Sequence, residues 1–260
     1  MHNNSILTAS EIGVKDESYN KSLGLHGIVT MVQQLQPDAS VTVNYPDSDG
    51  QPMADNTKQF RWIVVIKENL ELLFVDQADV FVAGDLLWYP VEGDNTLRQA
   101  PDVMVVFGRP KGDRGSYRQW QEGSIAPQVV FEILSPGNRF GEMLRKLNFY
   151  DRYGIEEYYI YDPDKLELTG LQRGETDMQV IEETNGWVSP RLQIRFQMTD
   201  AELEIYRPDG QRFLTYSELG QQLEQERQRA DQEQLRANQE RERAERLAEQ
   251  LRAAGLEPDL

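Results

Sequence analysis

The chain has 260 residues, which is enough for one hydrophobic core with an appendage. It contains no cysteine, so disulfides, thiolate metal sites and a cysteine nucleophile are excluded, and we expect a reducing, cytoplasmic location. The net charge of -17 argues against tight non-specific nucleic-acid binding, and no apolar run reaches the roughly 20 residues that would cross a membrane.

The first third of the chain leads from an irregular segment into a helix. Residues 1–44 are interpreted as an N-terminal extension, in which residues 25–35 form a candidate short helix before Pro37. Residues 45–56 are dense in turn-forming residues and predict a loop. Apolar residues at helical spacing then predict a helix over residues 57–74, with Asp55 or Asn56 as its N-cap.

The middle of the chain alternates strands and helices. Short strands are predicted at residues 78–84 and 85–91, followed by longer apolar strands at 100–108 and 126–136 with a polar loop, 108–124, between them. A helix over residues 139–153, capped by Asn138 and stopped by Gly154, leads to a strand at 155–163. Strand, helix and strand with short joints predict a parallel pair. Residues 166–213 predict antiparallel hairpins.

The tail, residues 217–260, is a charged helical segment. Leu223, Ala230, Ala237, Ala244 and Leu251 recur every seventh residue, but the fourth residue after each is usually polar, so the apolar seam is narrow. Two interpretations stay open, a single solvated helix and a coiled coil that would make the protein a homodimer.

Two isolated carboxylates are the strongest functional signal. Asp102 lies in the apolar run APDVMVVFG and Glu132 in APQVVFEILSP, and a bare carboxylate in such a buried strand is costly. If the strands are neighbours in the right register, the two carboxylates converge on one face and repel each other unless a cation lies between them. Oxygen ligands of this kind suit Mg²⁺ (or Mn²⁺).

Lys146 is the third candidate residue. The helix that follows the Glu132 strand folds back over the sheet, and Lys146 lies about as deep along that helix as Glu132 does along its strand. Structural alternatives stay open, because Asp102 after Pro101 suits a turn or cap and Glu132 suits a buried ion pair with Lys146.

The polar loop offers a candidate nucleic-acid contact. It contains Arg109, Lys111, Arg114 and Arg118, with Tyr117 and Trp120 between them as candidates for stacking on bases. An ordinary solvated turn is the alternative interpretation.

These motifs resemble a known family. YPDSDGQPMAD, VFVAGDLLWY, APDVMVVFG, FEILSP and YDRYGIEEYYIYDP, in this order over about residues 45–173, are similar to the Uma-type putative restriction endonuclease family of cyanobacteria, within the PD-(D/E)xK nuclease-like superfamily. The resemblance implies an α/β restriction-endonuclease-like core over residues 45–216, with a central mixed β-sheet flanked by helices and a long C-terminal helix or coiled coil.

The resemblance also implies site residues. The superfamily aspartate falls on Asp102 and its second acidic residue on Glu132, while Leu134 stands where a lysine is usual, which implies that Lys146 takes over from the helix. It further implies first-helix contributors, for which Asp55 and Gln59 are the candidates, and Asp85 is a candidate extra metal ligand.

The expected function is Mg²⁺-dependent hydrolysis of phosphodiester bonds in DNA. The alternative is a catalytically inactive nuclease-like protein that binds or assembles partners through its helical tail, because the net charge is -17 and the strand lysine is missing.

Overall fold

The computed structural model describes residues 43–254. The predicted N-terminal extension, with its candidate helix at residues 25–35, therefore lies outside the described residues except for Val43 and Asn44.

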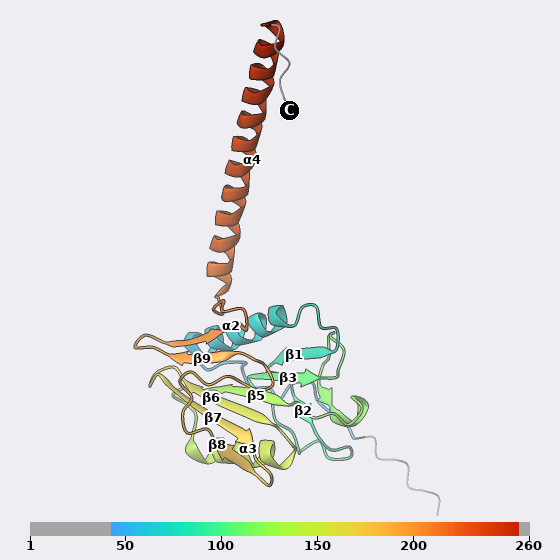
Figure 1. The fold of residues 1–260 in the computed structure, drawn as a ribbon. Coiled ribbons are helices and arrows are strands. Elements are labelled where there is room, and N and C mark those ends of the chain that lie inside the picture. The colour runs from blue at the N-terminus through green and yellow to red at the C-terminus, as the bar shows by residue number, and fades with distance from the viewer. Residues whose placement is uncertain (1–42, 255–260) are drawn as a thin grey trace, which may run out of the picture. The chain divides into compact units, whose positions relative to one another are not determined.

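A mixed sheet forms the centre of the described part (Figure 1). Its strand order is β1-β3-β5-β6-β7-β8, in which β5 and β6 run parallel and every other neighbouring pair runs antiparallel. The bounds are β1 Val80–Gly84, β3 Val103–Phe107, β5 Val129–Ile133, β6 Glu157–Asp162, β7 Glu167–Arg173 and β8 Met178–Val180. The predicted parallel pair and the mixed sheet are confirmed.

Helix α2 (Thr57–Leu73) covers one face of the sheet (Figure 1). The side chain of Asn56 accepts hydrogen bonds from the backbone N–H groups of Lys58 and Gln59 at 3.0 and 2.9 Å, so Asn56 rather than Asp55 is the N-cap. The apolar side of α2, with Ile63, Ile66 and Leu70, packs on inward-facing strand residues, including Val103, Val105 and Phe131.

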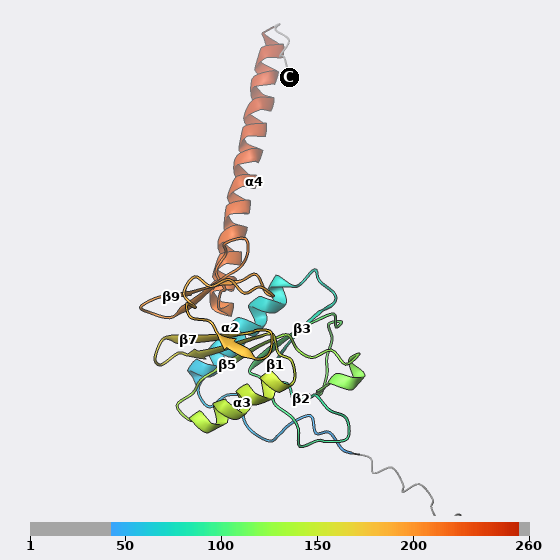
Figure 2. The ribbon, with the colours of Figure 1, turned by 60° about the horizontal axis from the view of Figure 1, so that its bottom comes forward.

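Helix α3 (Phe140–Arg152) covers the opposite face (Figure 2). It packs against the other set of alternating strand residues, including Met104, Val130 and Tyr158. The prediction of Asn138 as its N-cap is wrong: Arg139 occupies that position, and no side chain caps the helix. The Asn138 side chain instead accepts the backbone N–H of Ser135 at 2.7 Å and closes the preceding turn. Gly154 ends the helix region with φ +88°, as predicted.

Two short pairings lie beside the main sheet. β2 (Trp88–Tyr89) pairs parallel with β4 (Tyr117–Arg118), and a 3₁₀ helix, η1 (Gln119–Gln121), follows. The segment 108–124 is therefore partly structured rather than a plain polar loop. The hairpin of β9 (Arg195–Met198) and β10 (Leu203–Tyr206) is antiparallel, as predicted.

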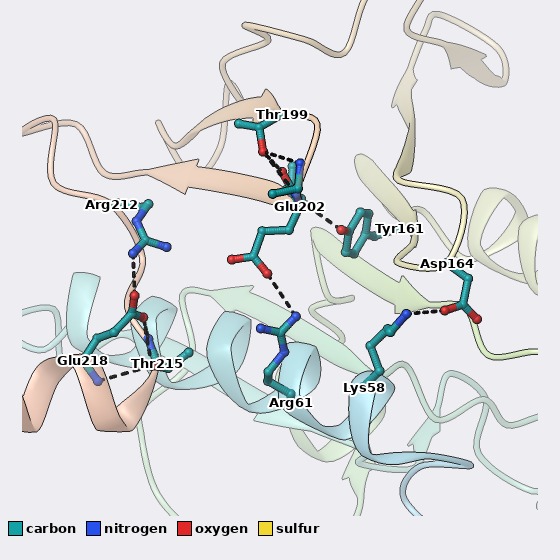
Figure 3. Close-up of polar contacts among 11 residues, drawn as sticks. Lys58, Arg61, Tyr161, Asp164, Thr199, Glu202, Arg212, Thr215 and Glu218 are labelled. Atoms are coloured by element: carbon teal, nitrogen blue, oxygen red, sulfur yellow. Dashed lines mark hydrogen bonds and ion pairs between the residues drawn. The ribbon is translucent and has the colours of Figure 1, made fainter.

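Helix α4 (Tyr216–Ala253) confirms the helical tail. Thr215 and Glu218 form a capping box at its start, and Arg212 donates to Glu218 at 2.6 Å (Figure 3). Asn69 of α2 holds the preceding residue, because its side chain both donates to and accepts from the backbone of Leu214. Within residues 43–254, no helix combines the length and apolar character that crossing a bilayer requires.

Candidate active site

Asp102 and Glu132 lie opposite each other on neighbouring strands. β3 and β5 run antiparallel with Val103 opposite Phe131 and Met104 opposite Val130, and one step further along this register places Asp102 opposite Glu132. Directly opposed side chains in such a pair have Cβ atoms about 5 Å apart. Both carboxylates are buried, with exposed fractions of 8% and 2%. The structure thus brings them together on the face that α3 covers.

Glu132 is held by two side chains of α3. The Lys146 ammonium lies 2.6 Å from Oε2 of Glu132, and the Tyr150 hydroxyl donates to Oε1 at 2.5 Å. Lys146 and Tyr150 are four residues apart, so they project from the same side of the helix. The sequence placed Lys146 and Glu132 at similar depths, and in the structure the two side chains are in contact. Tyr150 was not predicted, although its spacing from Lys146 points to it.

Asp102 accepts a hydrogen bond from the end of β5. Its Oδ2 atom lies 2.6 Å from the backbone nitrogen of Ile133, next to Glu132. Asp102 directly precedes β3, so its side chain satisfies an N–H group at the point where the β3–β5 ladder ends. This hydrogen bond gives Asp102 the cap-like role that the sequence left open, and it also holds the Asp102 carboxylate beside Glu132.

Carboxyl groups outnumber cationic groups around these residues. Burial, and then the adjacent Glu132, raise the pKa of Asp102 to about 8. Burial also raises the pKa of Glu132, against the pull of Lys146 and Tyr150. Burial lowers the pKa of Lys146, but the attraction of Glu132 outweighs it and leaves that pKa above its ordinary value. Asp85, whose own pKa is raised by burial, also interacts electrostatically with Lys146 and Asp102. The Lys146 ammonium thus interacts with four carboxyl groups, those of Glu132, Asp102, Asp85 and Glu142.

Tyr158 contributes a hydroxyl without a partner. It lies on β6 opposite Val130, on the same sheet face as Glu132, and it is fully buried. Its hydroxyl has no hydrogen-bond partner among the described residues, and burial, then the charges of Glu132 and Asp102, raise its pKa. A buried orphan hydroxyl beside two carboxylates suits a bound water or ion.

The two first-helix candidates lie near the end of β5 without touching Glu132. Gln59 donates to the backbone carbonyl of Ile133 at 2.9 Å, and it accepts the backbone N–H of Asp55 at 2.8 Å. The Asp55 carboxylate accepts from the hydroxyl of Ser135 at 2.5 Å. Both side chains position the strand end that carries the site.

No preformed metal cage is present among residues 43–254, since they contain no group of three or more His, Cys, Asp or Glu side chains placed to hold an ion. Asp85 therefore affects Asp102 electrostatically but does not complete a ligand set with Asp102 and Glu132. The donor set that residues 43–254 offer is two opposed carboxylates.

The loop cations are mostly occupied within their own segment. Arg109 and Arg114 both pair with Glu122, at 2.8 and 2.7 Å, and these two ion pairs connect distant parts of the loop. The Arg118 guanidinium donates to the backbone carbonyl of Tyr45 at 3.2 Å. Lys111 has a covered ammonium group without a hydrogen-bond partner among the described residues.

The aromatic residues of this loop also make contacts within the protein. Tyr117 is fully buried and donates to the carbonyl of Ile125 at 2.7 Å, so the expectation that it stacks on bases is wrong. The ring of Trp120 lies 4.9 Å from that of Tyr45. The sequence could not reveal these internal contacts.

Comparisons with known proteins place the chain in a family. Its structure is similar to the crystal structure of a putative nuclease belonging to DUF820 from Anabaena variabilis ATCC 29413, with 18% identity, a TM-score of 0.40 and coverage of 54% of this chain and 74% of the other. No curated protein matches it. The profile of the Uma2 family, described as "Putative restriction endonuclease", matches residues 42–201. Since this match covers more than half of the chain, the protein belongs to the Uma2 family.

Proposed function

We propose that this protein is a Mg²⁺-dependent (or Mn²⁺-dependent) endonuclease that hydrolyses phosphodiester bonds of DNA. The membership in the Uma2 family, described as "Putative restriction endonuclease", supports a nuclease activity. The observation that carries the proposal is the buried pair of Asp102 and Glu132, which lie opposite each other while the ammonium group of Lys146 is paired with Glu132. A divalent cation would favour the ionised forms of these crowded, buried carboxyl groups.

The residues present fit a magnesium-type ion. Asp102 and Glu132 would hold it through carboxylate oxygens, with Asp85, which acts electrostatically on Asp102, as a further candidate. Mg²⁺ retains several waters and needs few protein ligands. The unpartnered hydroxyl of Tyr158 offers one of those waters a hydrogen bond. When bound, such an ion lowers the pKa of a coordinated water and stabilises charge on a phosphate.

The chain's own groups would position the reacting atoms. Lys146 would orient the attacking water or stabilise the charge that develops on the phosphate, because Leu134 leaves the usual strand position without an ammonium group. Tyr150 donates to the second oxygen of Glu132 and so fixes the carboxylate that would bind the ion and that Lys146 contacts. Asp55 and Gln59 hold the end of β5 in place.

A second candidate function is partner assembly through α4. This helix exposes Leu223 and Leu251, the two ends of the sevenfold apolar seam, and the homodimer left open by the sequence would use this seam. In this case the Glu132–Lys146–Tyr150 network would be a structural remnant of a nuclease site.

Nicking of supercoiled plasmid DNA separates these functions. We expect the wild-type protein to nick with Mg²⁺ or Mn²⁺ and not with EDTA, and we expect Glu132→Ala to reduce the rate by roughly 100-fold or more. Glu175→Ala, at an exposed carboxylate away from the site, serves as the matched control. Equal rates for wild type and Glu132→Ala would remove Glu132 from the mechanism.

A further inference from the structure

The ammonium group of Lys146 stands directly at the Glu132 carboxylate. It lies 2.6 Å from Oε2 of Glu132, and water hardly reaches the two side chains, whose exposed fractions are 12% and 3%. Oε1 of Glu132 accepts the Tyr150 hydroxyl, and Oδ2 of Asp102 accepts the backbone N–H of Ile133. In the described part of the chain, Oδ1 of Asp102 is thus the one oxygen of the two carboxylates without a hydrogen-bond partner. An ion that contacts both carboxylates therefore meets the Lys146 ammonium group.

A divalent ion and this ammonium group compete for the same carboxylate. Glu132 and Asp102 both attract Lys146 electrostatically, so the ammonium group already supplies a positive charge to the pair. Charges a few ångströms apart interact strongly where water is largely excluded, so a second cation at Glu132 is repelled by Lys146. The lysine ammonium is a compact charge on a flexible four-carbon stem, and it can leave Glu132 while the backbone of α3 stays in place.

Glu142 offers Lys146 a second position. It lies in the first turn of α3, four residues before Lys146, and a glutamate four residues before a lysine is the favourable order for an ion pair on a helix. Glu142 is partly buried, and its carboxylate makes no hydrogen bond or ion pair within the described residues. It already acts electrostatically on both Lys146 and Glu132. Rotation of the lysine side chain is therefore sufficient to move the ammonium group from one carboxylate to the other.

We infer that Lys146 is a switch with two positions, pairing with Glu132 in the metal-free protein and with Glu142 when a divalent ion binds Asp102 and Glu132. The contact with Glu132 is then autoinhibitory, because it opposes the ion and holds the ammonium group inside the site. Displacement releases Lys146 so that it can approach a phosphate. This inference rests on the proposed function, since it describes how that same site is regulated.

Titration of the full chain with Mn²⁺, followed by the electron paramagnetic resonance signal of the free ion, tests the switch. Lys146→Met removes the competing charge, so we expect it to bind Mn²⁺ roughly 10-fold or more tightly than the wild type. Lys165→Met, the control, removes an ammonium group from an exposed ion pair with Asp162 and should change the affinity by less than about 2-fold. The gain should disappear in Lys146→Met/Asp102→Ala, which lacks one of the two ligands. A lysine with a purely structural role would not oppose the ion.

Wild-type crystals soaked in Mn²⁺ test the switch without any substitution, which covers the case in which Lys146→Met does not fold. We expect the Lys146 ammonium group to lie within about 4 Å of the Glu142 carboxylate and farther than this from Glu132. An ion at Asp102 and Glu132 with Lys146 still paired to Glu132 would overturn the switch.

The titration separates this inference from the proposed function. Mn²⁺ binding by Lys146→Met that is absent, unchanged or weaker would overturn the switch. Tighter binding by Lys146→Met, together with no metal-dependent nicking by the wild type, would support the switch and overturn the endonuclease function. Nicking that depends on Glu132, with no gain of affinity in Lys146→Met, would do the reverse.

Discussion

At the scale of single residues, the Lys146 side chain decides whether Glu132 is tolerated in the core. Lys146→Met leaves the buried carboxylate without its ammonium partner, and we expect a loss of about 3–5 kcal/mol in the free energy of unfolding, measured by urea denaturation. The double variant Lys146→Met/Glu132→Leu should recover much of this loss. Lys165→Met, at an exposed ion pair with Asp162, is the control. A loss no larger than that of the control would contradict the account of the buried pair.

Two neighbouring tyrosines provide a matched comparison. Tyr150→Phe removes the hydrogen bond to Glu132, and we expect it to lower the free energy of unfolding by about 1–3 kcal/mol. Tyr158→Phe removes a hydroxyl that has no partner among the described residues, so its unfolding free energy should stay within about 1 kcal/mol of the wild type. Urea denaturation without added metal measures both. Equal losses would mean that the Tyr158 hydroxyl has a protein partner of its own.

The sequence reveals the site residues that break a pattern and conceals those that agree with one. Glu132 and Asp102 are recognisable because a carboxylate is costly in an apolar strand. Tyr158 lies in a strand rich in aromatic residues, so its sequence position suggests only core packing. The loop arginines suggest a basic patch, because the sequence does not show that Arg109 and Arg114 share Glu122.

At the scale of elements, the start of α4 depends on its capping box. The backbone N–H of Thr215 and its neighbours lower the pKa of Glu218 to about 2, so the ionised carboxylate stabilises the folded state above its ordinary pKa of 4.5. This contribution should disappear as the pH falls through about 2. We therefore expect Glu218→Gln to lower the melting temperature at pH 7 and to have no such effect near pH 2, by circular dichroism. An equal effect at both pH values would contradict the cap.

Local sequence patterns are sufficient to predict the long elements of this fold but not the short ones. Helices α2, α3 and α4 and the long strands follow periodicity and composition, and the parallel β5–β6 pair follows from the short connections around α3. The pairing of β2 with β4 involves two residues on each side, and only tertiary contacts define it. Asn138 suits a helix cap by type, but its side chain is already used by the turn at Ser135.

At the scale of the whole molecule, a net charge of -17 leaves little attraction for a polyanion. Arg109 and Arg114 are paired with Glu122, so the polar loop has few cations left for a phosphate backbone. We expect the logarithm of the affinity for DNA to fall with the logarithm of salt concentration with a slope of about -1 to -2. A slope steeper than about -5, in anisotropy titrations over a salt series, would require an extended basic track elsewhere on the protein.

The central claim is that Asp102 and Glu132 hold a divalent ion between them. A crystal structure of the protein soaked in Mn²⁺, with data collected to detect the anomalous scattering of manganese, tests it most directly. The account predicts an anomalous peak contacting oxygens of both carboxylates, and no such peak in crystals of Asp102→Ala. Crystals that show no manganese there, with Glu132 still bound to Lys146 and Tyr150 and Asp102 still bound to Ile133, would contradict it.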